Sequence, residues 1–458
     1  MEKYIASIDL GASKIAVAVG ERTRKGVKIR AYCEVPSNGM NRGQVENPRV
    51  VSNEVKKAIS IIKSEYGIEV KKAIVGIAGH SLKCITTDPT QTQRDSTSEI
   101  TYDEIVKITK GMEDMVMEDG EKVFCAIPQS YNVDNNMSVI QPEGMIGKTI
   151  TSRFKLVVGK KSYLTLIDNV MNLANVKVDR YIIEPIASAE AILTEEEKNG
   201  GVAVVDIGAG STDVVVIQGG IIRHVGIVPF GGDAITHDIC EGCSIGDKQA
   251  EAIKVREGVC FSDYAGNANI VFQSFGDKDV QVTKKFLSNI IQARMEEILE
   301  AVRYIVEQSK FDTKLRVGYL FTGGGSKIQN LENLASFILA KNIRKSLPNK
   351  FTITEDSDIK VNTPSASTAV GLILKGVQIL EEEGLPFDFA EEFIQTDSEQ
   401  SREKEFVSVE AVANKKEGEV VKEKKQKRSL KERFLGIQMP SLFNKDDDGD
   451  EKEDLNAV

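Results

Sequence analysis

Two glycine-rich turns, far apart in the sequence, constrain the fold of this chain more than any other feature. The first runs from Asp9 to Lys14 and reads DLGASK, and the second runs from Asp206 to Asp213 and reads DIGAGSTD. Each turn lies between two apolar runs that read as β-strands. Glycines let the backbone approach a ligand closely, and successive N–H groups in such a turn can bind an anion. The pair therefore predicts duplicated domains that hold a phosphate chain from both sides.

The acidic residue at the start of each turn extends this prediction. Asp9 and Asp206 can hold a divalent cation, usually through water. One such turn alone would more often be an ordinary hairpin than a phosphate site.

Length and composition bound the class of protein. The 458 residues can form two or more globular domains, and 41% hydrophobic with 28% charged residues is typical of a soluble protein. The net charge of -10 argues against nucleic acid as a partner. No apolar stretch approaches the roughly 20 residues of a transmembrane helix, and a predicted strand begins close to Met1. We therefore expect a cytoplasmic protein without a signal peptide.

The six cysteines include one CxxC pair, Cys240 and Cys243. His237 lies nearby, so a metal site is an alternative, but no second CxxC or HxxxH completes it. We interpret these residues as structural or incidental thiols.

The apolar patterns divide the chain into segments. Strands alternate with one helix, from about Asn47 to Tyr66, before a block of different character begins near residue 83. After about Gly384 the sequence becomes charged and of low complexity. We expect a first domain at 1–82 with 163–200, an inserted α+β subdomain at 83–162, a second domain at 201–232 and 311–384, a mostly helical subdomain at 233–310 with an irregular middle near 266–279, a disordered linker at 385–427, an amphipathic segment at 428–443 and an acidic tail at 444–458.

A third glycine-rich turn, TGGGS at 322–326, follows the predicted strand Val317–Phe321 and precedes a predicted helix from Ile328 to Leu339. Its glycines would let a flat group such as a nucleoside lie against the backbone. The helix N-terminus would add positive partial charge towards phosphates. Alone, this motif is more often a simple strand-to-helix turn.

The order of these features resembles the actin-like ATPase superfamily, which contains actin, DnaK-type chaperones, MreB and sugar kinases. Within it the chain most resembles the FtsA family of bacterial division proteins. The insertion between the strand near Ile77 and the helix near Lys161 is the feature that distinguishes this family from MreB and DnaK. The strings that carry the likeness are SNGM at 37–40, GQV at 43–45, IP at 127–128, EPIASA at 184–189, GGDAIT at 231–236, AEAIK at 250–254, IQARMEEI at 291–298 and GGGS at 323–326. The likeness spans about residues 1–380. It implies an α/β, actin-like (duplicated ribonuclease H-like) two-domain fold with nucleotide in the interdomain cleft and an FtsA-type inserted subdomain.

The resemblance also implies ATP and Mg²⁺ as cofactors and, at most, slow ATP hydrolysis. Asp9 and Asp206 would organise Mg²⁺ through water. Glu184 would position an attacking water, although it could instead cap the sheet. Glu251 and Lys254 would reach the ribose and base edge, with a surface ion pair as the alternative. The other implied nucleotide-binding residues are Gly11, Ala12, Ser13, Lys14, Gly208, Ala209, Gly210, Ser211, Thr212, Gly232, Gly323, Gly324, Gly325 and Ser326.

A basic cluster between Lys422 and Arg433 leads into an apolar segment that ends at Met439. On a helix its larger apolar side chains share a face, which predicts an interfacial helix attracted to anionic lipid. This resembles the terminal amphipathic helix of FtsA, although Gly436 and Pro440 shorten it and an acidic tail follows. A partner-binding or merely charged tail is the alternative. The expected membrane residues are Leu430, Lys431, Arg433, Phe434, Leu435 and Ile437.

The function implied by the resemblance is cell division. The chain would bind ATP, form filaments through its inserted subdomain, and tether the tubulin-like FtsZ polymer to the inner face of the cytoplasmic membrane at the septum. FtsZ would contact about 233–310, and other division proteins would also bind. One alternative is a small-molecule kinase of the same superfamily, which would need a general-base aspartate facing a substrate hydroxyl. Another is an actin-like pilus-assembly protein, which is expected to lack the amphipathic tail.

Overall fold

The computed structural model describes residues 3–393, apart from residues 25, 80, 96–97, 119, 135, 137, 274–278, 350–352 and 356–358. The described residues belong to one compact unit, Met1–Phe393. The predicted amphipathic segment, the acidic tail and the predicted linker from residue 394 onward lie outside the described residues. The finer division into subdomains stays a prediction.

The first sheet has the strand order β12-β7-β1-β2-β3-β20. The strands β1 and β2 are antiparallel and are joined by the first glycine-rich turn, while β7 runs parallel to β1. Both strands of this hairpin are buried, as their nearly continuous apolar sequence predicts. The bounds are β1 Lys3–Leu10, β2 Lys14–Thr23, β3 Gly26–Pro36, β7 Lys72–Ile77, β12 Lys177–Ile183 and β20 Ile353–Glu355, with the small hairpin β4 Met40–Asn41 and β5 Gln44–Val45 after β3.

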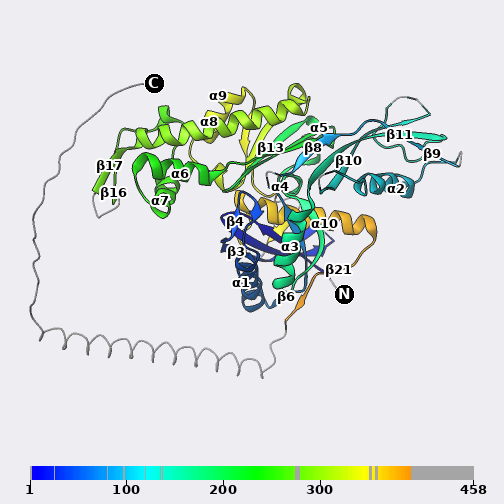
Figure 1. Cartoon of the computed structure of the whole chain (residues 1–458), viewed down its shortest axis with the longest axis horizontal. Helices are drawn as coiled ribbons and strands as arrows, with labels where there is room; N and C mark the ends of the chain where they lie inside the picture. Colours follow the sequence, from blue (N-terminus) through cyan, green and yellow to red (C-terminus); the bar gives the residue numbers. More distant parts are fainter. Residues whose placement is uncertain are drawn as a thin grey trace, which may run out of the picture. The chain divides into compact units, whose positions relative to one another are not determined.

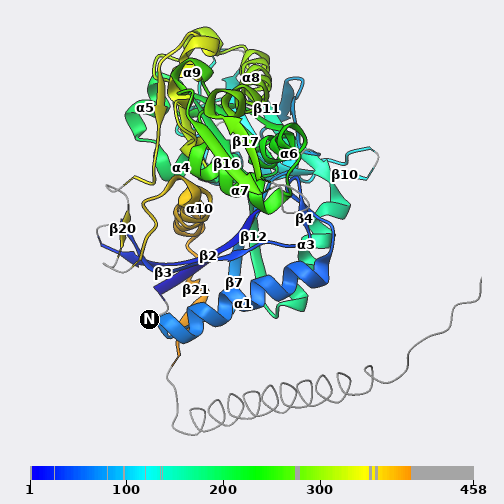
Figure 2. The same ribbon diagram turned by 90° about the vertical axis from the view of Figure 1, so that its left-hand side faces the viewer.

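Helices cover both faces of this sheet (Figure 2). The helix α1 (Pro48–Tyr66) packs beside α3 (Lys161–Leu173) on one face, and α10 (Ser367–Glu383) lies on the other. Asn47 caps α1 by accepting a hydrogen bond from the Val50 N–H, and Gly67 ends it with φ 64°. The predicted helix from Asn47 to Tyr66 is confirmed.

The second sheet has the order β15-β14-β13-β18-β19. It repeats the design of the first, because the antiparallel strands β13 and β14 are joined by the second glycine-rich turn and β18 runs parallel to β13. The long helix α8 packs on β14 and β15, and α4 packs on β13 and β14. The bounds are β13 Val202–Ile207, β14 Thr212–Gln218, β15 Ile221–Val228, β18 Gly318–Thr322, β19 Ile343–Lys345, α4 Glu184–Ile192, α5 Glu195–Gly200, α6 Gly232–Cys243, α7 Asp247–Glu257, α8 Lys284–Gln308 and α9 Leu331–Leu339.

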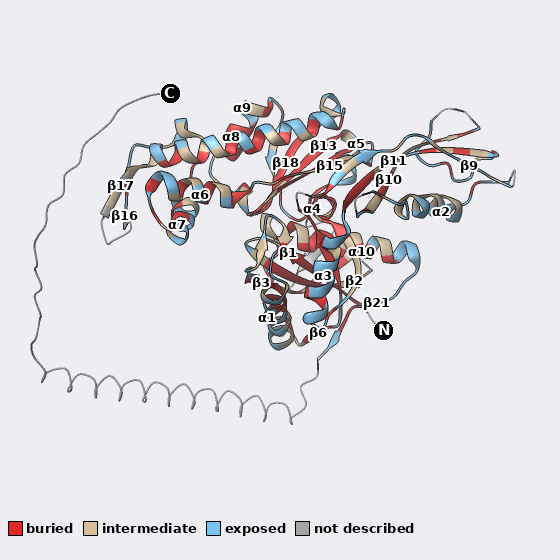
Figure 3. Cartoon of the chain, in the orientation of Figure 1, coloured by how far each residue is buried: buried red, intermediate tan, exposed pale blue. Residues whose placement is uncertain are grey.

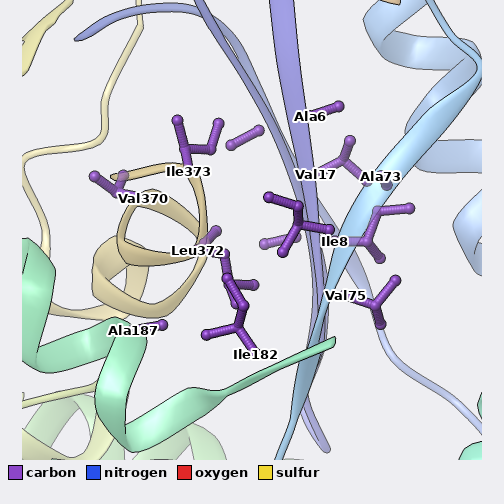
Figure 4. Close-up of a cluster of buried hydrophobic side chains, with 14 of the residues drawn as sticks. Ala6, Ile8, Val17, Ala73, Val75, Ile182, Ala187, Val370, Leu372 and Ile373 are labelled. Carbon is purple, nitrogen blue, oxygen red and sulfur yellow. The ribbon is translucent and has the colours of Figure 1, made fainter. Parts of the chain in front are cut away.

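The two sheets and their helices form a first and a second lobe, which are linked by the crossing of α4 and α10. A side chain at Gly371 on α10 would collide with the backbone of Ala187 on α4, so the two helices touch backbone to backbone. Figure 4 shows the buried cluster beside this crossing, with Leu372 and Ile373 of α10 near Ile8 of β1. The crossing is therefore closely packed and leaves no room for larger residues.

The predicted insertion forms its own small sheet, in the order β10-β11-β8 with β9 also paired to β11. Buried side chains that include Tyr131, Ile150 and Phe154 make a core separate from those of the lobes. The helix α2 covers this sheet and has no buried residue, so its outer face is open to solvent (Figure 3). The bounds are β8 Lys83–Thr86, β9 Thr90–Gln93, β10 Glu121–Val133, β11 Thr149–Lys160 and α2 Tyr102–Glu113.

The structure corrects two predictions along the chain. The segment expected to be irregular near 266–279 contains the hairpin β16 (Asn269–Gln273) and β17 (Asp279–Thr283), at the end of α8 (Figure 1). The residues 385–393 are not linker, because β21 (Phe387–Asp388) pairs with β1 and β22 (Ala390–Glu392) pairs with β6 (Ile68–Val70). Phe389 is fully buried and Ala390 and Phe387 pack beside it, so apolar residues within the otherwise charged stretch attach this segment to the first lobe.

Four short 3₁₀ turns complete the described elements: η1 Ser262–Tyr264, η2 Asp312–Lys314, η3 Gly324–Lys327 and η4 Pro364–Ala366. Within the described part of the chain, no helix is long and apolar enough to cross a membrane.

Candidate functional site

The three glycine-rich turns line a single cavity of about 940 Å³, to which both lobes contribute. This volume is at the upper end of the range typical of small-molecule sites. Most of the predicted residues line it, namely Asp9, Gly11, Ala12, Ser13, Lys14, Glu184, Asp206, Gly208, Ala209, Gly210, Ser211, Gly232, Glu251, Lys254, Gly323, Gly324 and Gly325.

The first two turns face each other at close range. A Cβ atom at Gly210 would lie 2.9 Å from the Cβ atom of Ala12 and 2.9 Å from the Cα atom of Arg42. The second turn is fixed from behind by α6, because the Gly232 N–H donates to the Gly208 carbonyl at 2.9 Å. Any side chain at position 210 would therefore separate the two turns.

Four carboxyl groups gather where these turns meet. Burial raises the pKa of Asp9 to about 7; Lys14 opposes that rise, whereas Asp206 adds to it. Burial likewise raises the pKa of Asp206, and it raises those of Glu184 and Asp213 well above their usual range, with the neighbouring carboxylates adding to the last two shifts. The cluster would gain from a positive charge placed in the cavity.

Two buried polar atoms on the cavity wall support a hydrated cation at this place. Asp213 Oδ1 and Ser37 Oγ are buried and have no hydrogen-bond partner, and both residues line the cavity. Oxygen ligands and water are the preferred surroundings of Mg²⁺. No group of three or more His, Cys, Asp or Glu side chains within the described ranges is arranged as a metal-binding set. The donor set therefore suits a cation contacted through water rather than one caged by the protein.

Lys14 connects the first turn to the segment before α10. Its ammonium group forms an ion pair with Glu34 and donates to the carbonyl of Ser365 at 2.8 Å. Since Lys14 also lines the cavity, it is held beside the carboxyl cluster by contacts on both sides.

The ion pair that was the alternative for Glu251 and Lys254 forms, and it lies at the cavity, while their contact with a nucleotide stays a prediction. Lys254 Nζ lies 2.6 Å from Glu251 Oε2, so the ion pair forms, and both side chains line the cavity. Lys254 also donates to the Gly232 carbonyl at 2.8 Å and to Thr236 Oγ1 at 2.7 Å. These contacts attach α7 to the first turn of α6.

The third turn differs from its prediction. Gly323 has φ 83°, and a side chain there would collide with Asp206, whereas a Cβ atom at Gly324 would meet nothing within 4 Å. The turn opens the 3₁₀ turn η3, and α9 begins only at Leu331, after Asn330 with φ 61°. The predicted helix from Ile328 was therefore too long, because the left-handed residue interrupts it, and no long helix starts at the turn.

Two predicted site residues do not line the cavity. Thr212 is fully buried and its hydroxyl donates to the Phe230 carbonyl at 2.9 Å. Ser326 is also fully buried and donates to the Gly323 carbonyl at 2.7 Å. Both hydroxyls stabilise the turns from behind, because strand alternation and the tight third turn direct them away from the cavity.

The cavity also includes residues that were not predicted as site residues, among them Ser37, Glu34, Asp213 and Thr368. Asp213 ends the second turn motif, so its acidic side chain was a visible signal. Thr368 carries no signal of its own, since only the folding of α10 brings it here. The CxxC residues lie elsewhere: Cys243 is buried in the second lobe, and Cys240 donates to Asp247 Oδ1 at 3.2 Å.

Two lobes, each with a glycine-turn hairpin facing a shared cavity, define an actin-like fold, and an extra subdomain is inserted in the first. The chain of a solved structure titled "PilM-PilN type IV pilus biogenesis complex" shares this fold, with a TM-score of 0.58 and 16% identity over 82% of this chain and 99% of that chain. Family models described as "Cell division protein FtsA" and "SHS2 domain inserted in FTSA" match residues 203–371 and 79–158.

Curated relatives identify the family. The cell division protein FtsA of Bacillus subtilis is 30% identical over 374 residues, which cover 81% of this chain and 83% of that protein. FtsA of Pseudomonas aeruginosa is 29% identical over 379 residues, covering 82% of this chain and 90% of that protein. The chain belongs to the FtsA family of cell division proteins. The family prediction made from the sequence is confirmed, as is the actin-like fold with its inserted subdomain.

Proposed function

We propose that this chain binds ATP with Mg²⁺ in the cavity between its lobes, assembles into filaments, and tethers FtsZ polymers to the inner face of the cytoplasmic membrane. The observation that carries the nucleotide part is the convergence of three glycine-rich turns from both lobes on one cavity of about 940 Å³. Membership in a cell-division family supports a role at the septum.

The first two turns would bind the phosphates. Their backbone N–H groups can donate to phosphate oxygens, and Lys14 supplies a positive charge beside them. Mg²⁺, when bound, would offset the charge of the carboxyl cluster and of the phosphates, with Asp9 and Asp206 holding its water molecules.

The rest of the cavity would hold the nucleoside and the attacking water. Gly324 lines the cavity and leaves room for a flat group, and Glu251 and Lys254 line the same cavity. Glu184 is the first residue of α4, and its carboxyl group would hold a water molecule by a hydrogen bond. Hydrolysis would be slow at most.

The inserted subdomain is the proposed filament contact. Tyr102, Val106 and Ile146 are large apolar side chains that are exposed on it, which is the kind of surface that proteins bury on association. We further propose that FtsZ contacts the segment 233–310 and that the residues 428–443 bind anionic lipid. The membrane proposal rests on sequence alone, since those residues lie outside the described range.

The nucleotide proposal is tested by filling the cavity without disturbing the fold. Gly324→Val adds a side chain to a residue that lines the cavity. No protein atom lies within 4 Å of the position of its new Cβ atom, so the substitution should not disturb the fold. Gly266→Val is the matched control, because Gly266 also has nothing within 4 Å but does not line the cavity. We expect binding of a fluorescent ATP analogue to weaken at least tenfold in the first variant only. Equal binding by both variants would exclude this cavity as the nucleotide site.

The tether proposal is tested by liposome co-sedimentation with ATP. A chain truncated before Arg428 should lose binding to vesicles that contain anionic lipid, while the full chain sediments with them. Unchanged sedimentation would refute the tether. A strong increase of ATP consumption on adding a sugar or polyol would instead favour the kinase alternative.

A further inference from the structure

Asp206 is held by two hydroxyl groups, one from each of the helices that cross between the lobes. Ser188 Oγ on α4 donates to Asp206 Oδ2 at 2.7 Å, and Thr368 Oγ1 on α10 donates to the same oxygen at 3.2 Å. The two hydroxyl oxygens lie 3.0 Å apart. A single carboxylate oxygen is therefore the meeting point of both helices.

These contacts also set the direction of the other carboxylate oxygen. Asp206 Oδ1 lies beside Gly323, where a Cβ atom would collide with it. Asp206 and Thr368 both line the cavity, whereas Ser188 is fully buried behind them. One oxygen is thus engaged by the helix crossing, and the other is turned towards the third glycine-rich turn.

The two crossing helices are packed too closely to shift independently of each other when these hydroxyl groups move. Gly371 of α10 lies directly against the backbone of Ala187, one residue before Ser188. Because Asp206 is bonded to both helices and their backbones are in contact, a shift of Asp206 has to displace α4 and α10 as well. Hydrogen bonds to a charged group are strong enough to carry such a coupling.

From this geometry we propose that Ser188 and Thr368 are positioning residues: they hold Asp206 for the cation that accompanies the nucleotide, and they link cation binding to the crossing of α4 and α10. The inference rests on the proposed nucleotide function and adds to it a pair of residues, one of which lies outside the cavity. Neither hydroxyl is needed to contact the nucleotide itself.

The first test compares the Mg²⁺ dependence of nucleotide binding in three variants of the full chain. Ser188→Ala and Thr368→Val each remove one hydroxyl, and Thr368→Ser retains it. We expect the Mg²⁺ concentration for half-maximal binding of a fluorescent ATP analogue to rise about tenfold in the first two, which corresponds to about 1.4 kcal/mol. Binding in EDTA should stay within about twofold, and Thr368→Ser should behave like the unmodified chain.

Ser7→Ala is the matched control. Ser7 is also fully buried, and its hydroxyl donates to the Ala369 carbonyl of α10 at 2.8 Å, but it does not contact Asp206. We expect its Mg²⁺ dependence to be unchanged. An equal shift in Ser7→Ala would show that loosening α10 is sufficient, and would overturn the positioning role.

The second test measures the link to the helix crossing. Hydrogen exchange of α10 should slow when Mg²⁺ is added to the complex with the ATP analogue, and this protection should fall by at least half in Ser188→Ala and Thr368→Val. Unchanged protection in both variants would overturn the link. If the unmodified chain bound no nucleotide at all, the proposed function would fail first, so the two failures are distinguishable.

Discussion

Replacing Asp9 by asparagine should stabilise the protein in the absence of nucleotide and cation, and the gain should grow with pH. Asp9 is buried, and its pKa rises from 3.8 to about 7, mainly through that burial. A carboxyl group whose pKa is raised by folding favours the folded state at low pH and loses this contribution as the pH rises through the folded value. The cost of burying Asp9 therefore grows as the pH rises from 3.8 to about 7, and it is complete above that value.

The magnitude follows from the two pKa values. At 1.36 kcal/mol for each unit, the shift from 3.8 to about 7 corresponds to a cost of about 4 kcal/mol near pH 8. At pH 5 the folded group is protonated and the unfolded one is mostly ionised, which leaves a cost of about 2 kcal/mol. Asp9→Asn has no charge to bury, so its advantage in unfolding free energy should rise from about 2 to about 4 kcal/mol over this range.

The assay is urea unfolding in EDTA at pH 5 and pH 8, followed by far-ultraviolet circular dichroism because the chain has no tryptophan. Asp179→Asn is the control of opposite sign. Burial raises the pKa of Asp179, but hydrogen bonds and charges from Arg180 and Lys72 lower it more, so its loss should destabilise the fold at both pH values. Addition of ATP with Mg²⁺ should stabilise the unmodified chain more than Asp9→Asn. A gain that is absent, or is equal at the two pH values, would refute the reasoning.

Three further predictions concern the fold and the tail. Phe389→Ala should lower the unfolding free energy by about 3–5 kcal/mol, as truncation of a fully buried aromatic ring does, whereas a chain ended after Phe393 should unfold at the same urea concentration as the full chain. Gly371→Ala should leave little soluble protein after expression, because its new methyl group meets the backbone of Ala187; normal yield and an unchanged unfolding midpoint would contradict the close crossing. Deletion of Asn444–Val458, which carries seven acidic and two basic side chains, should increase sedimentation with anionic vesicles at low salt and have less effect at high salt; an equal effect at both would exclude electrostatic repulsion as the cause.

The main elements of the two lobes could be predicted because their signals are local. The first two turn motifs each lie between apolar runs that are typical of buried strands. Asn47 and Gly67 mark the ends of α1 by their own side-chain and backbone preferences. The hairpin of β16 and β17 was missed although β17 alternates polar and apolar residues, because each of its strands is only five residues long. The strand β21 was missed because its pairing partner, β1, lies at the other end of the chain.

The same distinction explains the candidate site. Glycine and aspartate at the turns are dictated by backbone geometry and charge, so the sequence by itself determined which segments could approach a phosphate. It could not determine which hydroxyls face the cavity. Thr212 and Ser326 belong to the motifs yet point into the protein, whereas Thr368 belongs to none of the three turns and lines the cavity.

The contact between Ser188, Thr368 and Asp206 was decided by the tertiary structure alone. Asp206 was recognised from its turn motif, but Thr368 lies 162 residues from it, and neither hydroxyl residue was predicted as part of the site. Their meeting depends on the packing of Gly371 against Ala187, which fixes how α4 crosses α10. The sequence by itself thus determined the three turns and the family, because their signals are local. The geometry of the helix crossing decided how the carboxylate of Asp206 is held.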